Sequence, residues 1–144
     1  MMVLLHRGGP TGEVGISAGD LEIGQVVHLN ESGVPIDYLA VHQSIPSNLY
    51  DASCEGTWLL RKNIAENRAW DSGNSNVLET SDIQAYLNGE WMSRYVAKGA
   101  GAIKQVKIPY RGNGGSGGTN YAGAGGLSCK IFLLSVYEVG WAIN

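Results

Sequence analysis

Cysteine and histidine are the residues whose spacing in this sequence tests most directly for chemistry. Cys54 and Cys129 are the only two cysteines and lie far apart in the chain. They match neither a disulfide framework nor a metal-ligand motif, so we expect two reduced, partly buried thiols rather than a disulfide. His6, His28 and His42 are scattered, and none is four residues from another. The spacing therefore predicts no metal site and no cofactor.

Nucleophile and acid–base patterns are equally sparse. Ser135 lies in LLSVY without the flanking glycines of a nucleophile elbow, and no histidine follows it in the chain. Paired carboxylates for glycoside hydrolysis are the remaining enzymatic pattern. Four acids could converge in space: Asp51, Asp71, Glu79 and Glu90. Because residues 1–90 contain twelve acids, some pairs are expected by chance, and we predict no catalytic residue.

A glycine-rich segment, RGNGGSGGTNYAGAGG at residues 111–126, contains a formal phosphate-binding pattern. Its glycines at 112, 114 and 117 match G-x-G-x-x-G. That fingerprint binds a pyrophosphate only where a strand precedes it and a helix follows at once, whereas more glycine and then a strand follow here. We therefore predict a long surface loop, in which three side chains could contact a ligand: Asn113, Asn120 and Tyr121.

Composition limits the class of protein. The 144 residues include 21 glycines and four tryptophans, and only 16% are charged, which favours a loop-rich α+β domain over a helix bundle. Apolar runs all fall short of the about 18 residues that a bilayer-spanning helix needs, so we expect no membrane insertion. The apolar run at residues 1–5 is too short for the core of a signal peptide.

Charge is distributed unevenly along the chain. Residues 1–90 hold four basic against twelve acidic side chains, whereas residues 91–144 hold six basic against one acidic. We expect the two halves to pack together and neutralise each other; the alternative is an anion-binding face. The basic residues are spread out without interleaved aromatic side chains, so we predict no nucleic-acid partner.

The chain divides at about residue 20. Glycines at 9, 12 and 15 recur every third residue, too briefly for a collagen helix, and we expect residues 1–20 to be a glycine-rich leader or connector. Residues 21–144 would form the domain. Residues 25–43 predict a hairpin turning at Glu31–Gly33, and residues 57–65 a strand or short helix.

Residues 81–88 give the clearest helix signal. Ser81 is a good N-cap, Gln84 completes a capping box, and Asn88–Gly89 predicts a left-handed stop. Weaker patterns follow: a second helix at 97–106, an edge strand at 106–110 and a buried strand at 128–135.

The order of these motifs resembles a domain family of unknown function from gut bacteria and their phages. The most specific elements are SDI at 81–83 followed by YLNG at 86–89, and FLLS at 132–135 followed by Glu138. Family members usually carry Trp in place of Tyr86. The resemblance covers about residues 20–140. It implies a C-type-lectin-like fold, related to formylglycine-generating enzymes and to the variable tip proteins of diversity-generating retroelements.

The resemblance also implies that the domain is incomplete at its C-terminus, with the main ligand site beyond Asn144. We then expect the apolar strand at 131–134 to lack a covering partner. The copper-binding cysteines of the enzyme relatives match neither Cys54 nor Cys129.

The function that the resemblance implies is a non-enzymatic binding or display module. It would belong to a phage or bacterial surface structural protein, located on a virion or cell surface, and recognise a receptor or glycan, as a homo-oligomer if it is part of a fibre. Two alternatives stay open at this point. One is an enzyme on the formylglycine-generating scaffold or a carbohydrate-active enzyme, and the other is a structural fibre adaptor.

Overall fold

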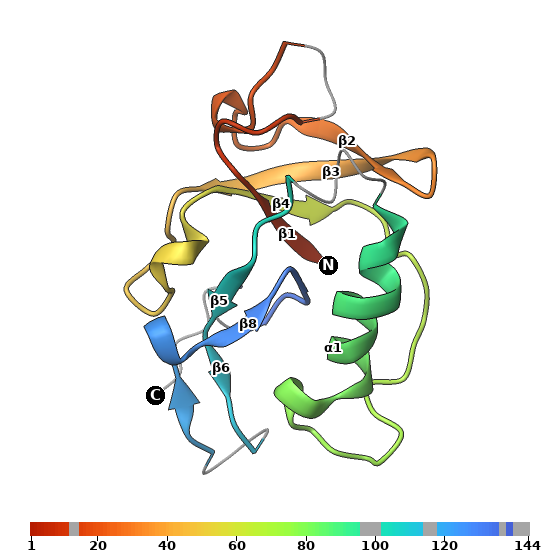
Figure 1. Cartoon of the computed structure of the whole chain (residues 1–144), viewed down its shortest axis with the longest axis vertical. Helices are drawn as coiled ribbons and strands as arrows, with labels where there is room; N and C mark the ends of the chain where they lie inside the picture. Colours follow the sequence, from red (N-terminus) through yellow and green to blue (C-terminus); the bar gives the residue numbers. More distant parts are fainter. Residues whose placement is uncertain (12–14, 96–101, 114–117, 136–137, 140–144) are drawn as a thin grey trace.

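The protein is α+β, with antiparallel sheets, one α-helix and several short helical turns (Figure 1). The computed structural model describes residues 1–11, 15–95, 102–113, 118–135 and 138–139. The predicted mixed class with antiparallel strands is confirmed.

A five-stranded sheet organises the fold, in the order β2-β3-β4-β1-β9. Its strands are β1 (Met2–Leu5), β2 (Val26–Glu31), β3 (Val34–Gln43), β4 (Thr57–Arg61) and β9 (Ile131–Phe132). All neighbouring strands are antiparallel. Because β1 pairs with β9, the beginning and the end of the described chain lie side by side in the sheet.

The expected leader is wrong at its start. Residues Met2–Leu5 form β1 between β4 and β9, and every one of these four residues is at most 1% exposed. The physical reason is that both faces of the sheet are covered. Val3 and Leu5 pack into one core, and Met2 and Leu4 into the other. A strand that is buried on both faces does not alternate apolar with polar residues. The sequence MVLL therefore carries no strand signal.

The expectation of an uncovered strand at 131–134 is wrong for Ile131 and Phe132. Both side chains are fully buried, Ile131 in the core on the side of helix α1 (Asp82–Tyr86) and Phe132 in the core that contains Trp58. Leu134 is 43% exposed. The predicted continuous strand at 128–135 also breaks at Lys130, because β8 (Leu127–Cys129) pairs with β5 (Val106–Ile108) while β9 pairs with β1.

The hairpin of β2 and β3 is confirmed. Glu31 lies opposite Val34, so Ser32 and Gly33 form a two-residue turn. Both have positive φ, 51° and 87°, as the type I′ turn of a tight hairpin requires.

The predicted glycine loop is more regular than expected. Strands β6 (Tyr110–Arg111) and β7 (Asn120–Tyr121) pair as a hairpin, and the 3₁₀ turn η6 (Gly123–Gly125) follows. The glycines allow close approach of the chain: a Cβ at Gly118 would lie 2.0 Å from the carbonyl oxygen of Gly112. The sequence pattern missed this hairpin because glycine usually weakens a strand.

Helix α1 begins as predicted and continues further than predicted. Ser81 Oγ accepts a hydrogen bond from Gln84 N at 3.3 Å, so the N-cap is confirmed. The left-handed stop at Asn88–Gly89 is wrong, because the chain continues as a π-helical turn, η4 (Leu87–Trp91), and a 3₁₀ turn, η5 (Met92–Arg94). Three further 3₁₀ turns are η1 (Ala18–Asp20), η2 (Ala52–Cys54) and η3 (Leu78–Thr80). The first half of the second predicted helix, residues 97–101, lies outside the described residues, and residues 102–106 are not helical.

Asn88 joins this helical segment to the sheet. Its Oδ1 accepts hydrogen bonds from Lys130 N at 2.7 Å and Ile131 N at 3.0 Å. Its Nδ2 donates to Ile131 O at 2.9 Å and to Gln84 O at 3.1 Å. A single side chain therefore satisfies the backbone at the point where the chain passes from β8 to β9.

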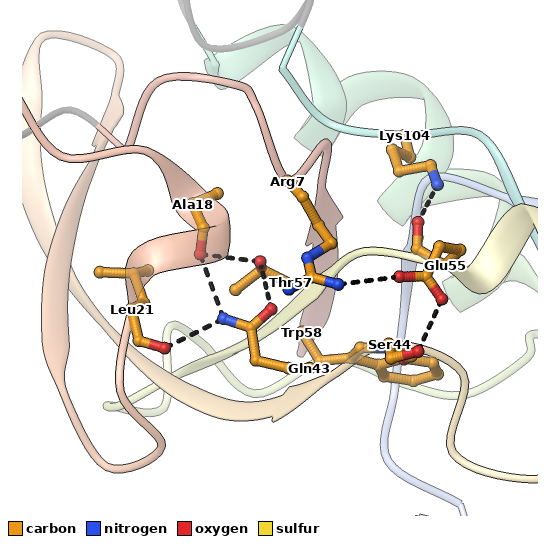
Figure 2. A network of polar contacts seen from close by, with 9 residues as sticks. All are labelled: Arg7, Ala18, Leu21, Gln43, Ser44, Glu55, Thr57, Trp58 and Lys104. Atoms are coloured by element: carbon orange, nitrogen blue, oxygen red, sulfur yellow. Dashed lines mark hydrogen bonds and ion pairs between the residues drawn. The ribbon is translucent and has the colours of Figure 1, made fainter.

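A polar network attaches the segment after β1 to the sheet (Figure 2). Gln43 Nε2 donates to the carbonyl oxygens of Ala18 and Leu21, at 3.1 and 3.0 Å. Thr57 Oγ1 lies 2.8 Å from both Ala18 O and Gln43 Oε1. Residues 18–21 are therefore part of the domain rather than of a leader.

The second part of this network centres on Glu55. Its carboxylate accepts from Ser44 Oγ at 2.7 Å and pairs with Arg7 Nη1 at 3.4 Å. Its backbone carbonyl accepts from Lys104 Nζ, and Trp58 Nε1 donates to Ser44 O at 2.9 Å (Figure 2). The charged groups are occupied by one another, which indicates a structural role.

We predict that Asn88→Ala destabilises the protein by about 2 kcal/mol, because it leaves backbone N–H groups at the start of β9 without partners. Thermal unfolding followed by circular dichroism should show a Tm lower by about 4–8 °C. Asn67→Ala, at an exposed position, is the matched control and should unfold like the parent protein. Equal Tm values for the two variants would contradict the assigned role of Asn88.

Candidate functional site

A hollow of about 360 Å³ lies between the segment that follows β4 and the helical segment α1–η4. Three aromatic residues and two arginines are among the residues that line it: Trp70, Tyr86, Trp91, Arg61 and Arg68. We call this hollow the aromatic groove. Trp91 and Tyr86 are buried, whereas Trp70 is 40% exposed and the neighbouring Ile64 is 89% exposed. The volume lies in the range of about 300–1,000 Å³ that is typical of small-molecule sites.

The wall that carries Trp70 is fixed to the start of helix α1. Trp70 O accepts a hydrogen bond from Ile83 N at 3.0 Å. Asp82 Oδ2 accepts from Ser72 N at 2.8 Å, and Asp71 Oδ1 accepts from Asp82 N at 3.4 Å. Hydrogen bonding from Ser72, aided by the charge of Arg68, holds the pKa of Asp82 below its usual value. The backbone that carries the exposed indole is thus hydrogen-bonded to the start of helix α1.

Arginine side chains lie over the aromatic rings. The guanidinium carbon of Arg68 is 3.4 Å from the ring centroid of Tyr86, and that of Arg94 is 3.9 Å from the Trp91 ring. Both distances are within the range of cation–π contacts. Arg94 Nη2 also donates to the Tyr86 hydroxyl at 2.9 Å.

One carboxylate serves both of these arginines. Glu66 Oε1 lies 3.5 Å from Arg68 Nη1, and its Oε2 lies 3.6 Å from Arg94 Nη2. The pair of Glu66 with Arg94 joins one residue of the acidic half to one of the basic half. Neutralisation of one half by the other stays a prediction. Hydrogen bonding to Glu66 and burial raise the pKa of Tyr86, so its hydroxyl stays protonated at neutral pH.

A buried polar cluster of Glu31, Tyr38, Arg61 and Tyr95 adjoins the groove. Glu31 accepts from the Tyr38 hydroxyl at 2.6 Å and from Arg61 Nε at 3.0 Å. The hydroxyls of Tyr38 and Tyr95 are 2.6 Å apart. Burial raises the pKa of both tyrosines, that of Tyr95 to about 12. Arg61 lies with its guanidinium carbon 5.9 Å from the Trp91 ring, so this cluster fixes two residues of the groove.

A second hollow, of about 350 Å³, lies on the other face of the sheet, beside Trp58. His42 packs edge-on against Trp58, with the ring centroids 6.4 Å apart. Glu138 accepts from the Tyr50 hydroxyl at 2.6 Å and from Ser135 N at 2.6 Å. Both of its oxygens are engaged by the protein. The aromatic groove, with an exposed indole and a fixed wall, is the stronger candidate.

The side chains predicted from the glycine segment lie elsewhere, on the β6–β7 hairpin. Asn113 lies two residues after the end of β6 with φ 59°, and Asn120 and Tyr121 form β7. The Tyr121 ring stacks on Tyr110, with centroids 4.9 Å apart and planes 14° from parallel. Hydrogen bonding to Glu79 raises the pKa of Tyr110 to about 12. The structure therefore provides a second aromatic surface at this hairpin and leaves the binding role of the three residues a prediction.

Sequence reasoning missed the aromatic groove. Tyr86 and Trp91 are five residues apart, a spacing that an α-helix does not place on one face. The π-helical turn brings their rings to a centroid distance of 6.1 Å. Trp70 comes from an irregular segment without any periodic pattern, so only its residue type pointed to a contact role.

Both cysteines and Asp51 have structural positions in the fold. Cys54 and Cys129 are free and buried, and burial raises their pKa values to about 11 and about 12. Asp51 accepts from Ser53 N at 2.9 Å, at the start of η2. Within the described ranges, no three side chains of the metal-ligating types gather closely enough to hold an ion. Among the described helices, none has the length and apolarity to cross a bilayer.

Comparison with known proteins gives one match. The family model for a domain of unknown function, DUF6273, matches residues 55–144. This range begins just before β4 and contains all three aromatic residues of the groove. No curated protein and no solved structure matches the chain.

The state of the two cysteines gives a direct prediction. At about pH 8 in the native protein, neither thiol should react with Ellman's reagent within minutes, because burial and a raised pKa keep the thiolate fraction very low. After unfolding in guanidinium chloride, two equivalents should titrate. Rapid reaction of the native protein would contradict the buried placement, and no reaction after unfolding would indicate a disulfide.

Proposed function

Because the chain belongs to the DUF6273 family, whose function is unknown, we propose a function from its own surface: a non-enzymatic binding module that takes its ligand in the aromatic groove. The observation that carries this proposal is the exposed indole of Trp70 beside a hollow with aromatic walls. An exposed tryptophan costs solvation free energy, and here backbone hydrogen bonds hold its segment at the start of α1.

A glycan is the ligand class that suits this groove. A pyranose ring has an apolar C–H face and a polar edge, so it can stack on an indole while its hydroxyls meet planar polar groups. Trp70 offers the ring, and Asn63, Glu66 and Arg68 are polar residues in the same lining. Aromatic walls with a few placed polar groups are the usual composition of small-molecule sites.

We further propose the context that the sequence resemblance implies. The chain would be part of a C-type-lectin-like display domain in a structural protein of a phage or bacterial surface, with gut bacteria as the host environment. In such proteins the principal ligand-contacting residues lie in the C-terminal portion of the domain. The aromatic groove would then act beside that surface, as a second contact for the same receptor or glycan.

The enzymatic alternative has less support. A formylglycine-generating type of chemistry needs reactive thiols, whereas burial raises the pKa of both Cys54 and Cys129 well above neutral. Three of the four acids considered for glycoside hydrolysis serve separate elements. Asp51 caps η2, Asp71 binds backbone beside α1, and Glu79 accepts from Tyr110.

We predict that Trp70→Ala removes glycan binding and leaves the fold intact. A printed array of bacterial and mucosal glycans identifies a bound oligosaccharide, and isothermal titration with that oligosaccharide should then show at least about tenfold weaker binding by the variant. Circular dichroism and thermal unfolding check that both proteins are folded.

Tyr121→Ala is the matched control, because Tyr121 is also 40% exposed but lies on the β6–β7 hairpin. It should bind like the parent protein. Loss of binding in the Tyr121 variant alone would place the site on the hairpin, and an array without any bound glycan would count against the proposed function.

A further inference from the structure

We propose that the sugar unit in the aromatic groove carries a carboxylate, and that Arg68 is the residue that binds it. This inference rests on the proposed function and specifies the chemical class of the ligand. Arg68 lines the groove, and its side chain is 44% exposed, so a ligand can reach the guanidinium.

The orientation of Arg68 is already fixed without a ligand. Its guanidinium carbon lies 3.4 Å from the Tyr86 ring centroid, so one face of the group is covered by the ring. Stacking on one face leaves the N–H groups pointing outward in the guanidinium plane. Arginine binds carboxylates through two parallel N–H donors in this plane, and fixing the plane in advance lowers the entropy lost on binding.

The hydrogen-bonding capacity of Arg68 is not used up by the protein. Its ion pair with Glu66 has an N–O distance of 3.5 Å, longer than the about 2.7–2.9 Å of a charge-assisted hydrogen bond. Glu66 is also shared with Arg94 at 3.6 Å. Asp82, a further acid near Arg68, is hydrogen-bonded to the backbone of Ser72. The donors of Arg68 are therefore available to a second, incoming carboxylate.

The two other basic side chains in the lining are less suited to a carboxylate. Arg61 is committed to the buried Glu31 through two hydrogen bonds, at 3.0 and 3.3 Å. Lys62, which pairs with Asp37 at 3.8 Å, lacks the planar pair of donors that an arginine offers. Arg68 is thus the cation of the groove that combines exposure, a fixed plane and weak pairing.

The presence of an exposed indole in the same lining as Arg68 favours an acidic sugar over an acidic peptide. The exposed indole of Trp70 lines the same hollow, and a hexuronate or similar sugar presents an apolar ring face beside its carboxylate. An aspartate or glutamate side chain offers the carboxylate without a rigid ring to stack.

The test is an array of oligosaccharides that contain hexuronate, neuraminate or muramate units, each printed beside its carboxyl methyl ester and with neutral oligosaccharides. Acidic peptides with one aromatic residue are printed on the same array. We expect the acid forms to bind at least about tenfold more tightly than their esters, and added salt to reduce this difference. Titration calorimetry then measures the best pair with each variant.

Arg68→Gln should bring the acid and the ester to within about threefold of each other, while binding of the ester is retained through Trp70. Arg68→Lys should restore part of the preference, because it keeps the charge without the planar pair of donors. Lys130→Gln is the control, since it removes one positive charge outside the groove lining and should leave the preference unchanged.

The outcomes separate the two proposals. Equal binding of acids and esters that is lost in Trp70→Ala overturns the carboxylate inference and leaves the glycan-binding function standing. An acid preference that persists in Arg68→Gln overturns the role of Arg68. Binding of the acidic peptides alone, or of no probe on the array, overturns both the inference and the proposed function.

Discussion

The buried carboxylate of Glu31 is the interaction on which the rest of the structure depends. It lies at the end of β2 with 7% of its side chain exposed, and it is paired with Arg61 of β4. It also accepts a hydrogen bond from Tyr38 of β3, whose hydroxyl contacts that of Tyr95. A buried charge that loses its partner costs about 3–5 kcal/mol, so these four side chains must be assembled together. The cluster therefore fixes three strands and the end of the helical segment at one point.

This cluster fixes one wall of the aromatic groove. Arg61 extends from Glu31 toward the Trp91 ring, and Arg94 covers the same ring at 3.9 Å. Trp91 is 2% exposed and forms part of a wall rather than a contact surface. The exposed residue is Trp70, whose backbone carbonyl is hydrogen-bonded to the start of α1. Fixing the backbone of this segment in advance lowers the conformational entropy that the segment would lose on binding.

Local signals in the sequence predicted the tight turn of the first hairpin and the start of the helix. They did not predict the continued helical turn after Leu87 or the β6–β7 hairpin, and non-local pairing could not be predicted. The hairpin at Ser32–Gly33 and the N-cap at Ser81 follow from turn and cap chemistry within a few residues. Strand β1 could not be predicted, because its partners are β4 and β9, far along the chain. The pattern Asn88–Gly89 predicted a helix stop. No local sequence rule could have predicted the hydrogen bond between the Asn88 side chain and the backbone of Ile131. Only the folded arrangement supplies that contact.

The two aromatic surfaces of the protein differ in how much of their polar capacity remains for a ligand. Tyr121 stacks face to face on Tyr110, and the Tyr110 hydroxyl is hydrogen-bonded to Glu79. The stacked ring faces and the Tyr110 hydroxyl therefore already have partners within the protein. Trp70 has no such stacked ring partner among the described residues, and Arg68 beside it shares a single carboxylate with Arg94. Two cations held by one anion leave donors unsatisfied at the edge of the hollow. This imbalance distinguishes the proposed ligand surface from the aromatic pair of the β6–β7 hairpin.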